Sequence, residues 1–469
     1  MLFNSSSFII FFVITYILYM CLRSSKSQNI LLLIASYSFY SAWDWRFLSL
    51  LLMSTCIDYY AAIKIEKSSN KKSRTLWLML SVIFNLSMLG FFKYYNFGIE
   101  ALSDLLAYIG LNAHISTLNI ILPVGISFYT FQTISYTVDV YRKKREPTKN
   151  LLNFSVYVAF FPQLVAGPIE KSTALLPQVE NYRRVNSEDV KIGLLWILLG
   201  YFKKVVIADT MAPMVEHAFN HVDEVSGLVS MIVVVSFAIQ IYGDFSGYTL
   251  IARGISRLMG IRLTKNFNAP YLASSPRDFW KRWHISLSSW LQEYLYISLG
   301  GNKKGTTCKY ISLMLTMLLG GLWHGARWNF LLWGFYHGLL LIICHSLSKG
   351  KPASDINWNV VRIAKTLGTF SLVLFGWLLF RVENMSQLWD ILINISNNLV
   401  WGVDVMQYLT PTLTCFTLIM SYHIWIETAK DELVLLKLHP VVRFGVYVFL
   451  IVSITAIGFK PTAFLYFQF

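Results

Sequence analysis

Long apolar runs separated by short polar breaks recur along the whole chain. A straight transmembrane helix needs roughly 20 apolar residues, and several of these runs are shorter. The pattern therefore predicts an all-α, polytopic membrane protein with about eleven transmembrane helices, in which the remaining runs form re-entrant or interfacial helices. The runs lie near residues 8–22, 30–42, 46–63, 76–92, 118–138, 151–166, 192–208, 228–242, 310–323, 328–345, 363–380, 406–426 and 442–458.

Basic residues in alternate loops predict the orientation of the first five helices. They follow the first, third and fifth runs, as expected if these loops are cytoplasmic and the N-terminus is outside. The alternation then fails, because a basic linker at 171–191 follows after only one more run. We therefore expect the run 151–166 to enter the membrane and return. Irregular backbone is tolerated at that depth only where it lines a cavity within the protein.

The composition excludes several classes of protein. Only 14% of the residues are Asp, Glu, Lys or Arg, against about 25% in soluble proteins, and the mean hydropathy is +0.51. A soluble enzyme, a disordered chain and a disulfide-stapled secreted module are therefore excluded. The net charge of +15 is expected to lie in cytoplasmic loops, so nucleic-acid binding is not indicated. The five cysteines form no C-x-x-C pair, and we expect no redox or metal role for them.

A stretch around residue 284 combines aromatic, basic and histidine side chains at helical spacing. On a continuous helix, Trp280, Trp283 and His284 share one face, with Lys281 and Arg282 beside it. The spacing alone favours an interfacial helix with an aromatic anchor and cations that reach toward water. A functional path along this face is the alternative.

His324 is the strongest single candidate for a functional residue. It stands within an apolar segment, and Gly320, Gly321 and Gly325 flank it. Ionisable groups at membrane depth are costly and mark functional paths, and glycine allows the close backbone approach that a substrate path requires. On a continuous helix, His337 would lie about 220° around the axis from His324, so we expect no paired role for the two histidines.

Two weaker patterns leave alternatives open. His217 and His221 could form a metal-binding pair at helical spacing, but the sequence offers no third ligand, and an exposed interfacial loop is favoured. The polar turn with Asn302, Lys303 and Lys304 could hold an anionic group such as a phosphate-bearing acyl carrier, or it could be a solvated basic turn. The sequence has none of the loop motifs of serine hydrolases, NTPases or dinucleotide enzymes.

Several segments together resemble the signature blocks of the membrane-bound O-acyltransferase family. More specifically, they resemble its bacterial branch of alginate O-acetyltransferase-like membrane subunits and related polysaccharide and peptidoglycan acetylation proteins. The segments that carry the resemblance are Gly243–Tyr248, Phe279–Ser288, Leu299–Gly305 and Leu319–Ala326, together with Leu31–Tyr37, Leu122–Tyr129 and Tyr466–Phe469.

The resemblance implies a ring of helices around a central channel, with a cytoplasmic opening for an acyl donor and an outer opening for an acceptor. It assigns the invariant histidine of the family to His324 and a second, more variable active-site histidine to His284. Lys281 departs from the branch, in which Arg is common at this position, and keeps the charge without the planar fork. The further residues expected to bind the donor or line the channel are Asp244, Trp280, Lys281, Arg282, Trp283, Asn302, Lys303, Lys304 and Trp323.

The implied function is transfer of an acetyl group from a cytoplasmic thioester across the membrane, for O-acetylation of an extracellular or periplasmic polysaccharide. In this chemistry, His324 would act as the general base, and His284 would orient or polarise the thioester carbonyl from the cytoplasmic side. Asp244 is a candidate to orient a histidine. The expected donor is acetyl-CoA or an acyl carrier protein thioester, and no permanently bound cofactor or metal is expected. Transfer of D-alanine or another acyl group is an alternative within the family. A non-enzymatic transporter or flippase of a lipid-linked intermediate is an alternative outside it.

The resemblance also implies a location and partners. We expect a multi-pass protein of the bacterial cytoplasmic (inner) membrane, with the N-terminus outside. The expected partners are membrane lipid, a periplasmic or extracellular protein that places the acetyl group on the polymer, and the polysaccharide acceptor, with no nucleic acid. The chain is expected to form one domain over 1–469, with N-terminal helical spans at 1–150, a catalytic core with re-entrant segments at 151–345, and C-terminal helical spans at 346–469.

Overall fold

The computed structural model describes residues 1, 3–111, 116–165, 167–348, 359–402, 404–458 and 464–465. Every regular element within these ranges is a helix, which confirms the predicted all-α fold. The chain forms two compact units. The first comprises Met1–Gly193, Ala252–Thr264 and Gly325–Arg327, and the second comprises Leu194–Ile251, Lys265–His324 and Trp328–Phe469.

The helices of the first unit are α1 (Ser6–Cys21), α2 (Ser25–Asp44), α3 (Leu48–Lys67), α4 (Lys71–Leu89), α5 (Tyr95–Tyr108), α6 (Ile126–Tyr141), α7 (Leu151–Ala159), α8 (Phe161–Leu164) and α9 (Ser172–Glu180). Two helices contribute residues to both units, α10 (Ser187–Tyr201) and α12 (Gly227–Leu258). The second unit contains α11 (Asp209–Asn220), α13 (Pro276–Arg282), α14 (Ile285–Trp290), α15 (Gly305–His324), α16 (Trp328–Ser348), α17 (Val360–Arg381), α18 (Met385–Asn397), α19 (Val405–Ala429) and α20 (Pro440–Ile457).

Six helical stretches in the described part of the chain are long and apolar enough to cross a bilayer. The longest, Ser25–Lys67, has 43 residues and comprises α2 and α3. Each of these two helices has 20 residues, which is about 30 Å of helix and matches the hydrocarbon thickness. Many apolar side chains on these helices point outward, for example Val441 and Phe444 on α20, which are 72% and 69% exposed. An outward apolar surface of this kind fits contact with lipid and confirms the predicted polytopic membrane protein. The number of eleven membrane crossings stays a prediction.

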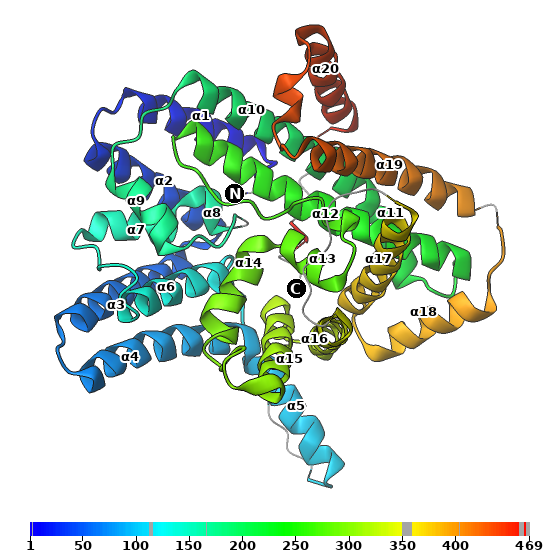
Figure 1. The fold of residues 1–469 in the computed structure, drawn as a ribbon, viewed down its shortest axis with the longest axis horizontal. Helices are drawn as coiled ribbons and strands as arrows, with labels where there is room; N and C mark the ends of the chain where they lie inside the picture. The colour runs from blue at the N-terminus through cyan, green and yellow to red at the C-terminus, as the bar shows by residue number, and fades with distance from the viewer. Residues whose placement is uncertain are drawn as a thin grey trace. The chain divides into compact units, whose positions relative to one another are not determined.

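Polar groups within the first unit find their partners inside the protein. In Figure 1, α3, α4 and α6 lie side by side on the blue and cyan side of the ribbon. Asp58 of α3 is fully buried there, and it accepts hydrogen bonds from Ser81 Oγ at 2.5 Å and from Asn85 Nδ2 at 2.9 and 3.0 Å. A bilayer core offers no water to such groups, so the three helices must satisfy one another.

The apolar run 151–166 forms two short helices, α7 and α8, whose residues are mostly buried. The nine residues of α7 make about 14 Å of helix, roughly half of the hydrocarbon thickness. Neither helix is therefore long enough to cross a membrane. Its last residue, Ala166, lies outside the described residues.

In the second unit, α15 and α16 form a closely packed antiparallel pair. A Cβ atom added at Gly321 of α15 would meet the backbone of Phe330, and one added at Gly334 of α16 would meet the backbone of Met317. Glycine at these positions is what lets the two helix backbones approach. α15 ends at His324 and α16 begins at Trp328, so the continuous helix assumed between His324 and His337 is wrong.

Candidate active site

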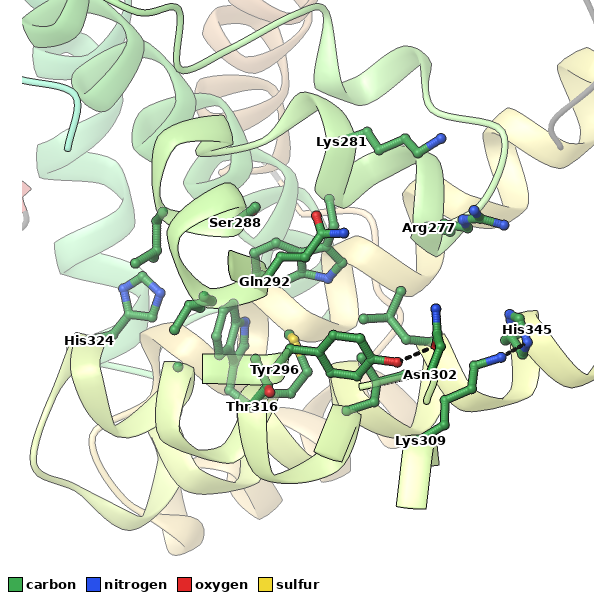
Figure 2. Close-up of a pocket in the computed structure, with 18 residues that line it drawn as sticks. Arg277, Lys281, Ser288, Gln292, Tyr296, Asn302, Lys309, Thr316, His324 and His345 are labelled. Atoms are coloured by element: carbon green, nitrogen blue, oxygen red, sulfur yellow. Dashed lines mark hydrogen bonds between the residues drawn. The ribbon is translucent and has the colours of Figure 1, made fainter. Parts of the chain in front are cut away.

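A cavity of about 340 Å³ lies in the second unit among residues of α13 to α16. Figure 2 shows His324 at one end of it and Arg277, Lys309 and His345 at the other. Its lining is mostly apolar between these ends. The lining residues are Arg277, Trp280, Lys281, Leu287, Ser288, Leu291, Gln292, Tyr296, Asn302, Lys309, Leu313, Thr316, Met317, Gly320, His324, Trp333, Leu341 and His345.

His324 is the last residue of α15 and is 5% exposed. Three aromatic rings surround its imidazole, those of Trp323 and Trp333 at 5.0 Å and that of Phe380 at 5.3 Å between ring centroids. The close approach of α15 and α16 brings Trp333 to this position. The imidazole thus lies in an apolar surrounding and still lines the cavity, which is a suitable setting for a base that acts on a bound substrate.

The structure breaks the helix that was predicted around His284. α13 ends at Arg282, His284 adopts a left-handed conformation with φ 42° and ψ 56°, and α14 begins at Ile285. The reason lies in another segment of the chain, because Asn266 takes up the backbone groups after the break. Its main-chain oxygen accepts from the amide of Ile285 at 3.0 Å, and its Oδ1 accepts from the amide of Ser286 at 3.2 Å. The prediction that Trp280, Trp283 and His284 share one face of a continuous helix is therefore wrong.

His284 is fully buried and is not among the residues that line the cavity. Its ring packs edge to face on Phe245 at 4.6 Å, and on Trp323 at 5.9 Å between centroids. Trp323 also contacts His324, at 5.0 Å. The two predicted histidines are thus linked through a shared tryptophan, with only His324 lining the cavity.

Basic side chains gather at the end of the cavity away from His324. Arg277 and Lys281 stand one helical turn apart on α13, and Lys309 comes from α15. Lys309 Nζ also forms a hydrogen bond with Nε2 of His345, a residue of α16. The sequence predicts Lys281 but not Arg277, Lys309 or His345, because these three come from three helices and lie outside the segments that carry the family resemblance.

The predicted polar turn contributes only one of its members to the cavity. Asn302 lines it, and its Oδ1 accepts a hydrogen bond from the Tyr296 hydroxyl at 2.7 Å. Lys303 and Lys304 are exposed and are not among the lining residues. Of the predicted lining residues, the structure thus brings Trp280, Lys281 and Asn302 together with His324, and leaves these two lysines outside.

Asp244 has other partners in the second unit. It forms an ion pair with Lys204 at 2.6 Å, and Lys204 also pairs with Asp209 at 2.9 Å. The backbone amide of Leu465 donates to Asp244 at 2.7 Å. These contacts account for a buried carboxylate without any role in lining the cavity. The neighbouring terminal motif Tyr466–Phe469 lies outside the described residues.

Arg282 and Trp283 also point away from the cavity. The Arg282 guanidinium forms ion pairs with Asp278 and Glu427 at 2.8 and 2.7 Å. Trp283 is 2% exposed and packs against the ring of Trp377 at 4.7 Å between centroids. Their role in the fold is therefore to hold the chain around the break at His284.

His337 is buried behind the cavity. Its ring lies 5.3 Å from that of Trp280 and 4.8 Å from that of Trp333, and both of these tryptophans line the cavity. His337 itself is not a lining residue. The histidine thus packs against the wall from outside.

The His217 and His221 rings stack at 4.8 Å at the end of α11, and His217 Nδ1 is 3.1 Å from the Tyr408 hydroxyl. Within the described ranges, no group of three or more His, Cys, Asp or Glu side chains is arranged to hold a metal ion.

Comparison with known proteins shows the family of this chain. The model of the membrane-bound O-acyltransferase family matches residues 30–361. The chain belongs to this family. Two relatives match over most of their length. "Probable alginate O-acetylase AlgI" of Azotobacter vinelandii is 39% identical over 90% of this chain and 83% of its own length. "Peptidoglycan O-acetyltransferase" of Helicobacter pylori is 36% identical over 82% of this chain and 78% of its own.

A more distant relative is "Teichoic acid D-alanyltransferase" of Bacillus subtilis, which is 29% identical over 56% of this chain and 69% of its own length. The family resemblance predicted from the sequence segments is confirmed. This chain is a polytopic O-acyltransferase of the membrane.

Proposed function

We propose that this protein takes an acetyl group from a cytoplasmic thioester donor and passes it across the membrane for O-acetylation of an extracellular or periplasmic polysaccharide. One observation carries the proposal. A single cavity extends from a histidine at its apolar end to a cluster of cations at the other. Such a cavity suits a donor with a reactive acyl end and an anionic carrier.

The chemistry needs few groups, because a thioester is already activated. His324 takes the proton of the acceptor hydroxyl as the oxygen attacks the thioester carbonyl carbon. The carbon–sulfur bond then breaks, and the thiolate receives the proton from the imidazolium. The apolar rings around His324 exclude water, which would otherwise compete as acceptor. His284, linked to His324 through Trp323, acts as an orienting residue in this scheme.

The donor is a phosphate-bearing thioester, either acetyl-CoA or an acyl carrier protein with its prosthetic arm. Arg277, Lys281 and Lys309 would hold its phosphate groups as fixed positive charges. The acyl group then lies in the apolar part of the cavity. None of the described lining residues is Asp or Glu, so the ammonium of a D-alanyl group would find no carboxylate there. This favours acetyl over D-alanyl transfer, which is the second candidate because a D-alanyltransferase is among the relatives.

Acceptor, partner and orientation complete the proposal. The names of two relatives, an alginate O-acetylase and a peptidoglycan O-acetyltransferase, support a cell-envelope polysaccharide as the acceptor. The basic loops support a multi-pass protein of the bacterial inner membrane with its N-terminus outside. A periplasmic or extracellular partner protein would deliver the acetyl group to the polymer. We propose residues 151–345 as the catalytic core between helical spans at 1–150 and 346–469 of a single domain.

The test is His324→Ala in purified protein reconstituted into lipid vesicles. Acetyl-CoA or an acetylated carrier protein is supplied on one side, and alginate or peptidoglycan fragments are supplied on the other side as acceptors, together with a periplasmic extract that provides the partner protein. Thiol release and acetylated product are measured together. We expect a loss of about 10²–10⁴-fold in rate, with wild-type yield and monodispersity, whereas His284→Ala should fall between His324→Ala and wild type.

The outcomes separate the proposal from its rival outside the family. A transporter or flippase would release no thiol and form no acetyl ester in wild-type vesicles, and His324→Ala would change only the movement of a solute. A well-folded His324→Ala protein with wild-type transfer would refute the mechanism. Transfer of D-alanyl in preference to acetyl groups would assign the second candidate function.

A further inference from the structure

Four charged residues from three helices are linked in series beside the cavity wall. Glu427 of α19 accepts from Arg282 Nη1 at 2.7 Å and from Nη2 at 3.0 Å, which is a two-pronged contact. The same carboxylate accepts from Arg362 Nη2 of α17 at 3.1 Å. Arg282 Nε also donates a hydrogen bond to Asp278 Oδ1 at 2.8 Å. The four side chains carry two positive and two negative charges, so their sum is zero.

The network is largely shielded from solvent. The side chains of Glu427, Arg362, Arg282 and Asp278 are 7%, 12%, 13% and 15% exposed. Buried ion pairs of this kind are poorly screened, so removal of one member leaves an uncompensated charge. A planar guanidinium held by two parallel hydrogen bonds is also fixed in orientation, which a single contact would not achieve.

Glu427 contacts α13, a helix too short to be stable by itself. α13 has seven residues, Pro276–Arg282, and a helix so short is unstable by itself in water. Its first turn is capped by Ser275, whose side chain accepts from the amide of Asp278 at 3.2 Å. Its last residue, Arg282, is fixed by Glu427 and by its own carbonyl, which accepts from the amide of Asn268 at 2.9 Å.

The position of α13 determines the donor end of the cavity. Arg277, Trp280 and Lys281 are all on this helix and all line the cavity. The chain turns at His284 two residues after Arg282. A shift of Arg282 would therefore move one wall of the cavity and the start of the turn together, while His324 on α15 would stay in place.

We propose that Glu427 is a positioning residue for donor binding, which acts through Arg282 on the wall formed by α13. The inference rests on the proposed function for its kinetic consequence, but the positioning of α13 is a separate physical claim. Glu427 itself is not a lining residue of the cavity and touches no reacting atom. Loss of Glu427 should change the apparent KM for the donor, because α13 forms part of the cavity wall and does not carry the general base His324.

A double variant distinguishes positioning from simple charge balance. Glu427→Gln together with Arg362→Gln removes one charge of each sign, so the remaining pair of Asp278 and Arg282 stays neutral. The double variant nevertheless loses the two parallel hydrogen bonds from Arg282 to the Glu427 carboxylate, which we call the clamp. Arg362→Gln alone is the matched control: it leaves one carboxylate charge uncompensated and should lower the stability of the fold, but it keeps Glu427 and Arg282 in contact. Arg282→Lys is a second route to the same defect, since it keeps the charge and loses the fork.

Two measurements on the reconstituted full-length protein test the proposal. We expect the double variant and Arg282→Lys to raise the donor KM by about tenfold with kcat changed less than about twofold, as for a loss of uniform binding. Hydrogen exchange of residues 276–286 should be faster in both, whereas Arg362→Gln should resemble wild type in both measurements. Wild-type donor KM and wild-type exchange in the two clamp-deficient proteins would overturn the inference.

The exchange measurement keeps this result separate from the proposed function. If the wild-type protein transferred no acyl group while the clamp-deficient variants showed faster exchange at 276–286, the positioning of α13 would stand and the proposed activity would fail. A double variant as inactive as His324→Ala, with kcat lost and donor KM unchanged, would contradict the assignment of Glu427 to donor binding.

Discussion

Replacement of Gly376 by Ala should disturb the donor cavity without touching any residue that lines it. Gly376 is on α17, and a Cβ atom added there would lie 2.6 Å from Nε2 of His337. Ordinary contacts begin at 3.4 Å, so the imidazole would have to retreat by about 0.8 Å. His337 is 2% exposed, and the rings of Trp280 and Trp333 lie directly against it.

The size of the effect follows from two opposing terms. Overpacking of a filled site costs about 1–3 kcal/mol, whereas alanine in place of glycine within a helix contributes about 1 kcal/mol of stability. We therefore expect Gly376→Ala to lower the free energy of unfolding by about 0–2 kcal/mol. A displacement approaching 1 Å at a substrate-positioning wall can cost up to about 100-fold in rate, so we expect kcat/KM for the donor to fall by about 10–100-fold.

Gly368→Ala is the matched control. Gly368 is on the same helix, and a Cβ atom added there would meet nothing within 4 Å. This substitution should raise the free energy of unfolding by up to about 1 kcal/mol and leave donor kinetics unchanged. The contrast between the two alanines isolates the contact with His337 from the general effect of replacing glycine in α17.

The assay combines initial rates of acetyl transfer in lipid vesicles with thermal unfolding followed by size-exclusion fluorescence. Removing the His337 imidazole, which the added methyl group would contact, provides the decisive test. His337→Ala by itself should keep most of the activity, and in combination with Gly376→Ala it should restore much of the lost donor kcat/KM. Gly376→Ala with the stability and kinetics of Gly368→Ala, or a double variant that recovers nothing, would refute the reasoning.

Two further predictions concern charge and topology. Lys309→Gln should raise the donor KM by about tenfold, as expected for loss of an ionic contact, whereas replacing both Lys303 and Lys304 by Glu should change the donor KM less than about twofold. Initial rates at varied donor concentration test this difference. Equal effects of the two changes would contradict the assignment of Lys309 to the cationic end of the cavity. A cysteine introduced at Lys71 should react only with membrane-permeant maleimide, whereas one introduced at Ser116 should react with an impermeant reagent, as the basic loops predict. The reverse labelling pattern would show that the proposed orientation is inverted.

The sequence by itself determined the class of structure and the central residue of the site. The apolar runs predicted a helical membrane protein because hydropathy is a local property, and a bilayer permits only structures that satisfy their own backbone. His324 could be identified for the same reason, since an ionisable ring among glycines and apolar residues is costly wherever the chain places it. The family resemblance added the chemistry.

The tertiary structure decided which other side chains meet His324. The helical spacing around His284 was misleading because Asn266, a residue outside that segment, binds the backbone after the break and stabilises a turn. Arg282 was predicted to face the donor, yet its partner Glu427 lies 145 positions away in the sequence.

The cationic end of the cavity has the same origin. Arg277, Lys309 and His345 come from three helices, and no periodicity in one segment connects them. Hydropathy and spacing report on a residue's own helix, whereas an ion pair or a cavity wall depends on which helices pack together. The close packing of α15 against α16 at Gly321 and Gly334 therefore places His324 at one end of the cavity.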